Sequence, residues 1–233
     1  MTFPSRKALA ILASAMIAGT MSFSALAQGQ SGGSGTRYQV DITNLTHAQQ
    51  FTPLLLVTHR PEFKLFTYGD PASPQLETLA EEGNVGPLRD SLQAQPQVSS
   101  VTAGTGLTAP GSHATFQIRA NFAHDRLSIA AMLIPTNDAF MSLSGGSLPL
   151  PNKSATYYLY ANDAGTERND ERCASIPGPN FAECGGPGQG GAPSGGEEGF
   201  VHIHNGIHGV GDLDAAERDW RGPVAKVVIT SAP

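Results

Sequence analysis

Three histidines near the C-terminus are the first residues whose spacing could hold a metal ion. In the segment FVHIH, His202 and His204 are two positions apart and therefore lie on the same face of an extended strand. His208 can approach them after an Asn-Gly turn, and His59 or His124 could supply a fourth nitrogen. Imidazole groups arranged in this way bind Zn²⁺ or Cu²⁺. The same histidines could instead hydrogen-bond neighbouring loops, so the pattern leaves a metal site and a structural role open.

Acidic residues gather in two segments, 134–143 and 160–172, and each segment follows an expected strand. Asp138, Asp163 and Glu167 could converge there, because the small residues of DAGTE let the backbone turn and bring its first and fifth side chains to one ion. Ca²⁺ takes six to eight oxygen ligands from carboxylates, carbonyls and water. The alternative is that these acidic residues are solvated turn formers.

Signatures of several enzyme classes are absent from the sequence. It contains no GxSxG nucleophile elbow, no phosphate-binding P-loop and no HExxH zinc-protease motif. Ser, His and Asp residues are common, but they form a catalytic triad only when the fold brings them together. We therefore expect a protein that is not an enzyme.

The elements that must position these side chains are mostly strands. Apolar and polar residues alternate with a period of two in RYQVDITNL, ATFQIRA, RLSIAAML, TYYLY, FVHIH and PVAKVVIT. The segment PLLLVTH is apolar throughout and predicts a buried strand. Many short strands, few helices and 27 glycines predict an all-β protein, an antiparallel β-sandwich.

Two short helices are expected between strands, over residues 73–84 and 85–95. Ser73 can cap the first helix, Pro74 suits its first position, and Gly83 suits its end.

A long, glycine-rich loop is expected from about residue 162 to residue 199. It contains both cysteines, Cys173 and Cys184. In an oxidising compartment such an isolated pair is expected to form a disulfide that pins the loop. A metal site shared by the two thiols is the alternative, but no further ligands with zinc-type spacing lie nearby.

The N-terminal segment is typical of exported proteins. Residues 1–27 combine Arg6 and Lys7, an apolar run of about a dozen residues and an Ala-Leu-Ala cleavage site, which predicts a signal peptide. A flexible Gly/Ser linker over residues 28–36 and one domain over residues 37–233 follow. We expect a secreted or periplasmic protein without a transmembrane segment, because the apolar run is shorter than the roughly 20 residues of a spanning helix.

The charge balance argues against nucleic acid as a partner. The formal net charge of −6 becomes −8 once the two basic residues of the signal peptide are removed, and no cluster of Lys and Arg is present. An acidic protein is better suited to bind calcium ions than to bind nucleic acid.

Several motifs together resemble the spondin N-terminal domain family, which is best known from F-spondin and its extracellular matrix relatives. They are VTH (57–59), MLIPTNDAF (132–140), NDAGTE (162–167) and WRGPVAKVVI (220–229), and the resemblance extends over roughly residues 37–231. It implies a β-sandwich like the synaptotagmin-type calcium- and lipid-binding domains.

The resemblance also implies one calcium ion, held by Asp138, Asp163 and Glu167. Two departures from the animal motifs stand beside these positions, since Ala139 and Asn162 replace tryptophans. Glu167 replaces an aspartate and can chelate through both oxygens.

The expected function is that of a secreted, calcium-binding, non-enzymatic module for extracellular or envelope adhesion. Its partner would be a glycan, a lipid or a protein, and its oligomeric state is left open. The alternative is a periplasmic zinc- or copper-binding protein or metalloenzyme, with His202, His204, His208 and His59 as metal ligands.

Overall fold

The computed structural model describes residues 35–187 and 196–232. The predicted signal peptide and nearly all of the predicted linker lie outside the described residues. Within the described part, no helix has the length and apolar character needed to cross a membrane.

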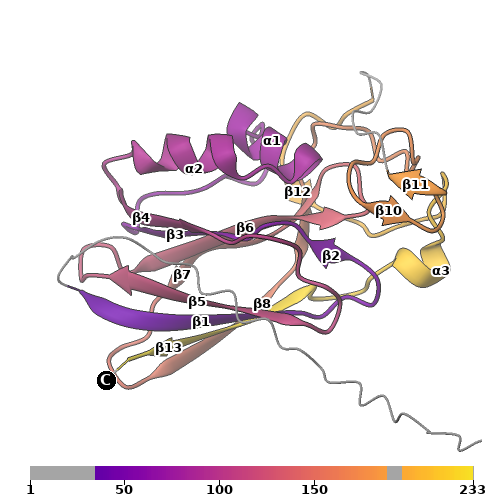
Figure 1. Ribbon diagram of the computed structural model, residues 1–233. Coiled ribbons are helices and arrows are strands. Elements are labelled where there is room, and N and C mark those ends of the chain that lie inside the picture. Colours follow the sequence, from indigo (N-terminus) through magenta and orange to yellow (C-terminus); the bar gives the residue numbers. More distant parts are fainter. Residues whose placement is uncertain (1–34, 188–195, 233) are drawn as a thin grey trace, which may run out of the picture.

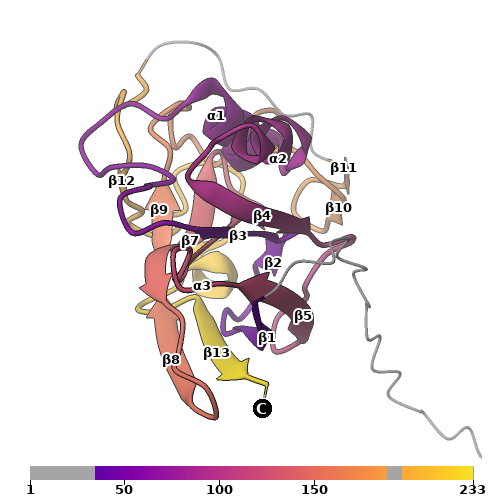
Figure 2. The same ribbon diagram turned by 90° about the vertical axis from the view of Figure 1, so that its left-hand side faces the viewer.

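Two antiparallel sheets pack face to face, and two helices cover the outer face of the larger sheet (Figures 1 and 2). The smaller sheet has the strand order β5, β1, β13, β8. Its strands are β1 (Thr36–Asn44), β5 (His113–Ala120), β8 (Ser154–Leu159) and β13 (Ala225–Ser231). The larger sheet has the order β12, β9, β7, β6, β3, β4, and β2 pairs with β6 beside this path. Its strands are β2 (Gln50–Phe51), β3 (Leu55–His59), β4 (Val98–Ala103), β6 (Arg126–Ile134), β7 (Ala139–Ser147), β9 (Ala161–Asp163) and β12 (His202–Ile203). The predicted all-β antiparallel sandwich is confirmed.

Alternating strands build the core between the two sheets. In β1, Tyr38, Val40 and Ile42 point inward and are buried, whereas the residues between them are more exposed. Strand β13 pairs with β1 from Tyr38 opposite Ser231 to Asn44 opposite Ala225, so the two ends of the domain lie side by side. The C-terminal strand is therefore part of the same sandwich.

Strand β6 differs from its expected pattern. Its sequence alternates, which predicts a strand with one solvated face, but all residues from Leu127 to Ile134 are buried. The reason is that two further cores cover the outer face of β6. Leu127 and Ile129 belong to the core between the sheets, whereas Ala130 belongs to a second core beneath the helices. Met132 and Ile134 belong to a third core beneath the long loop. Strand β3 is buried throughout, as predicted.

The helices that cover the second core are α1 (Pro74–Glu82) and α2 (Gly86–Gln93), close to the predicted ranges. The Oγ of Ser73 accepts a hydrogen bond from the backbone N–H of Leu76, as expected for an N-cap. Gly83 ends α1 in the left-handed conformation with φ +66°. Both helices bury leucines against the larger sheet.

A third, smaller core lies under the long loop. This loop contains the hairpin of β10 (Asn180–Phe181) and β11 (Gly186–Pro187), and the short helix α3 (Ala215–Arg218) lies close to it (Figure 1). Cys173 and Cys184 form the predicted disulfide. Phe181, Ile176 and Leu213 are buried in this core, so the segment has more internal packing than its composition predicts.

The strand expected over residues 200–204 is shorter in the structure. β12 comprises only His202 and Ile203, which pair with Asp163 and Asn162 of β9. His204 lies just beyond the ladder. This pairing makes β12 the edge strand of the larger sheet and places it beside Asp163, one of the predicted calcium ligands.

Candidate metal centre

The centre lies at one end of the larger sheet, where the β6–β7 connection meets the end of β9. Ala139 at the start of β7 is paired with Asp163 at the end of β9. The backbone N–H of Ala164 donates to the carbonyl of Asp138 at 3.3 Å. Asp138 and Asp163 therefore come together although they lie in different loops of the sequence.

Asp138 is fully buried and has one satisfied oxygen. Its Oδ2 accepts hydrogen bonds from the backbone N–H of Thr166 at 2.8 Å and of Glu167 at 3.1 Å, and from the Thr166 hydroxyl at 3.2 Å. Its Oδ1 is buried and has no hydrogen-bond partner among the described residues. Burial, together with the charge of the neighbouring Asp163, raises the pKa of Asp138 to about 8.

Asp163 is also buried, and both of its oxygens are held in place. Oδ1 accepts from the backbone N–H of Gly165 at 2.8 Å, and Oδ2 accepts from the Asn169 side chain at 2.7 Å. The Nε2 atoms of His202 and His204 lie 3.7 and 3.9 Å from Oδ1 and Oδ2, respectively. Both histidines thus face one carboxylate.

Glu167, the third predicted calcium ligand, is buried in the same loop. Its backbone N–H is one of the three donors to Asp138. The structure thus places all three predicted residues at one end of the sandwich, but their carboxylate oxygens do not form a group within 4.8 Å of one another among the described residues.

The segment that leads into β12 also borders the centre. The N–H of Gly199 donates to the carbonyl of Gly165 at 2.9 Å, and Val201 exchanges backbone hydrogen bonds with the segment 69–70. These contacts place Glu198 and His202 beside Asp163. The carboxylate oxygens and imidazole nitrogen of this trio lie within 4.8 Å of one another. Glu198 is not among the ligands predicted from the sequence, because its only local signal is an acidic pair in a glycine-rich segment.

Comparison with protein-family models identifies the Spondin_N family over residues 36–175, which is more than half of the chain. The chain belongs to the spondin N-terminal domain family. The matched region contains Asp138, Asp163 and Glu167, but it ends before Glu198 and the histidine segment. In a comparison with individually curated proteins, no sequence matched.

His204 of this spondin domain has a structural environment. Its Nδ1 accepts from the backbone N–H of Gly206 at 3.0 Å, so its Nε2 carries the proton and donates to Oδ1 of Asn169 at 3.2 Å. The ring packs against Trp220 with 5.1 Å between the ring centroids, and burial lowers the pKa of His204. His204 therefore supports Asn169, which in turn holds Asp163.

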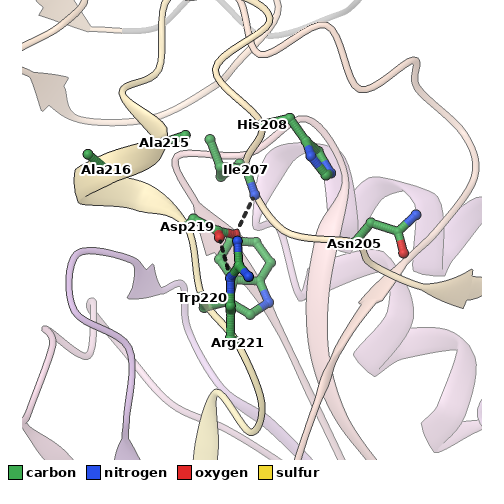
Figure 3. A pocket seen from close by; sticks show the side chains of 8 residues that line it. All are labelled: Asn205, Ile207, His208, Ala215, Ala216, Asp219, Trp220 and Arg221. Carbon is green, nitrogen blue, oxygen red and sulfur yellow. Dashed lines mark hydrogen bonds and ion pairs between the residues drawn. The ribbon is translucent and has the colours of Figure 1, made fainter.

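His208 is not part of the group formed by Asp163, Glu198 and His202. Its backbone N–H donates to the carboxylate of Glu171, and its side chain lines a separate pocket of about 370 Å³ (Figure 3). Asp219, which also lines that pocket, accepts from the backbone N–H of Ile207 and from Arg221. The pocket lining contains none of the predicted calcium ligands.

A second buried acidic group stabilises the loop after the centre. Burial alone would raise the pKa of Asp170, but hydrogen bonds from Arg172 N–H, Asn137 and Ser175 lower it below the ordinary value. The carboxylate of Glu171 accepts two backbone N–H groups of the segment 208–210. Asp170 and Glu171 therefore accept hydrogen bonds from the surrounding loops, which is a structural role.

His59 does not join the other histidines, contrary to the expected four-histidine group. His59 pairs with Arg126 at the start of β6. Asp163 pairs with the first residue of β7, and β7 begins beside Met132, near the other end of β6. Strand rise separates these positions by roughly 20 Å. His59 is fully buried, with Nδ1 against the carbonyl of Arg60 and Nε2 against the hydroxyl of Ser128, each at 2.8 Å. His124 lies in the loop before β6, at the same end of the strand as His59 and therefore also far from Asp163.

The burial of His59 predicts a dependence of stability on pH. Burial lowers its pKa below the ordinary value of 6.5. Below pH 6.5 the unfolded chain therefore takes up a proton at this residue that the folded protein does not, so the contribution of His59 to stability falls as the pH falls toward its folded-state pKa. Relative to the wild-type protein, His59→Gln should gain stability as the pH falls, by at most about 1.4 kcal/mol per pH unit for one proton.

Urea unfolding between pH 7 and pH 5 measures this effect. His113→Gln removes an exposed histidine and is the control, and buried His204 and Asp138 contribute equally in all three proteins. An unchanged slope in His59→Gln would contradict the assignment.

Proposed function

We propose that this spondin-family chain is a secreted, non-enzymatic binding module whose loops at one end of the sandwich are ordered by calcium. The observation that carries the proposal is the buried pair of Asp138 and Asp163. No Lys or Arg nitrogen among the described residues lies within 4.0 Å of either carboxylate. Two buried carboxylates repel one another unless a cation or a proton offsets their charge.

The donors fit calcium. Asp138 Oδ1 is a buried oxygen without a hydrogen-bond partner among the described residues, which is where a ligand oxygen would be expected. Asp163 adds carboxylate oxygens from the adjoining loop, and we propose that the carboxylate of Glu167, in the same loop, turns toward the ion when calcium binds. Ca²⁺ accepts such flexible oxygen sets, whereas Mg²⁺ requires near-octahedral geometry and releases its waters reluctantly. When bound, calcium would supply the positive charge that this carboxylate group lacks.

The loops that calcium would order carry exposed apolar side chains. Tyr68, Phe200 and Ile203 are large and exposed, and they lie on segments that pair with or flank the centre. The hydroxyl of Tyr68 donates to Asn162 at 2.6 Å, next to Asp163. This surface is our candidate contact region for an extracellular or envelope partner. The disulfide supports an oxidising location.

Calcium binding should stabilise the folded protein. Protein stripped with chelator should give a heat of binding in a calorimetric calcium titration and a higher melting temperature, with a smaller response to magnesium. At a hundredfold excess over the dissociation constant, linkage predicts a gain of about 2.7 kcal/mol. Asp138→Asn should lose most of this response while keeping the fold, because it preserves the side-chain shape and removes the charge.

Asp90→Asn is a matched control. The side chain of Asp90 is exposed on helix α2 and pairs with Arg89, so its loss should leave the calcium response unchanged. The absence of both heat and thermal shift up to millimolar calcium in the wild-type protein would reject the calcium proposal.

A further inference from the structure

We infer that Asp163, Glu198 and His202 form a second cation site, for a divalent transition metal of the zinc class. Their ligand atoms lie within 4.8 Å of one another. Glu198 and His202 lie outside the region that matches the family model. The site does not depend on the calcium proposal, although Asp163 belongs to both donor sets.

The His202 ring is oriented with Nε2 toward Asp163. Its Nδ1 lies 3.0 Å from the carbonyl of Ile203, which can only accept, so Nδ1 carries a proton. The other ring nitrogen, Nε2, faces Oδ1 of Asp163 at 3.7 Å. Nε2 has no hydrogen-bond partner among the described residues and almost no contact with solvent. A buried nitrogen without a partner, beside a buried carboxylate oxygen, is the arrangement that a bound cation would complete.

The surroundings of the trio match those of a metal site. Metal-binding histidines usually donate their other ring N–H to a carbonyl, and ligating carboxylates are held by hydrogen bonds of their own. His202 makes such a bond to Ile203. Asp163 is held by Gly165 and Asn169. The His202 ring also packs on Phe200, with 5.4 Å between centroids.

The distances and donors favour zinc over calcium at this position. Ligands about 2.1 Å from a tetrahedral zinc are about 3.4 Å apart, so the His202–Asp163 separation needs only a small contraction. Glu198 is exposed, which leaves room for its carboxylate to move inward and for the ion to reach the site. An imidazole nitrogen is a good ligand for zinc, whereas calcium prefers oxygen alone. Three protein ligands leave a fourth position for water.

Zinc titration of the metal-stripped chain in calcium-free buffer tests the inference. We expect one equivalent of Zn²⁺ to bind the wild-type protein. His202→Gln and Glu198→Gln should each weaken binding at least about tenfold. His208→Gln is the matched control, because it removes a nearby histidine that lies outside the trio, and it should bind zinc as the wild type does. Co²⁺ in place of zinc should give visible absorption bands of tetrahedral geometry that His202→Gln loses.

Further arms separate this site from the calcium centre. Asp138→Asn should keep the one-to-one zinc stoichiometry, and zinc binding should persist even if the wild-type protein shows no calcium response. Melting curves of the metal-free variants confirm that they fold. The inference is overturned if the wild-type protein binds no stoichiometric zinc. It is also overturned if His202→Gln binds zinc unchanged, or if Asp138→Asn abolishes zinc binding.

Discussion

Gly165→Ala is expected to lower the free energy of unfolding by at least about 3 kcal/mol and to remove the calcium response. Gly165 has φ +68°, a conformation that costs an L-residue about 1–2 kcal/mol. A Cβ at this position would also lie 2.3 Å from the carbonyl oxygen of Phe200. That contact can be relieved only by separating the Asp163 loop from the segment leading into β12. Chemical denaturation with and without calcium measures both losses.

Gly69→Ala is the matched control for this prediction. Gly69 also has a positive φ, of +86°, but a Cβ there would meet nothing within 4 Å. It should therefore cost only the conformational penalty of about 1–2 kcal/mol and keep the calcium response. Equal destabilisation by the two variants would show that the close approach of the two segments is unimportant.

Removal of the disulfide is expected to cost about 3 kcal/mol. Cys173 and Cys184 are separated by 11 positions, and closing a loop of that length restricts the unfolded chain by about this amount. In the folded protein, Cys184 packs against the third core. The Cys173→Ser/Cys184→Ser variant should unfold at a lower denaturant concentration than the oxidised wild-type protein.

Reductant provides the control for the disulfide. The wild-type protein should approach the stability of the double variant when reduced, whereas the double variant should not respond to reductant. If oxidised wild type and double variant unfold at the same midpoint, the bond does not stabilise this fold.

The sequence determined the elements whose signals are local. The alternation of Tyr38, Val40 and Ile42 predicts a strand because successive side chains of a strand point to opposite faces. Ser73, Pro74 and Gly83 predict a helix with its two ends because capping depends on neighbouring residues. The isolated cysteine pair likewise predicted the observed disulfide. The candidate calcium ligands could also be predicted, since the IPTNDAF and NDAGTE motifs carry the family resemblance.

Other features depend on contacts between segments that are distant in sequence. β6 is buried on both faces because α1 and α2 cover Ala130, and the third core covers Met132 and Ile134. The alternating pattern of β6 cannot report either cover. His202 and His204 have the same local spacing signal but different hydrogen bonds. The partners of His204 come from Gly206 and Asn169, whereas Nε2 of His202 has no hydrogen-bond partner among the described residues.

The composition of the candidate metal centre was decided by tertiary structure. Glu198 reaches Asp163 because Gly199 donates a backbone hydrogen bond to Gly165, and that bond has no signature in either segment alone. His59 is excluded because antiparallel pairing places it at the opposite end of β6. Residue types and short spacings therefore determined which side chains could bind metal. Only the long-range backbone pairing decided which of them meet, because it sets distances that local patterns do not contain.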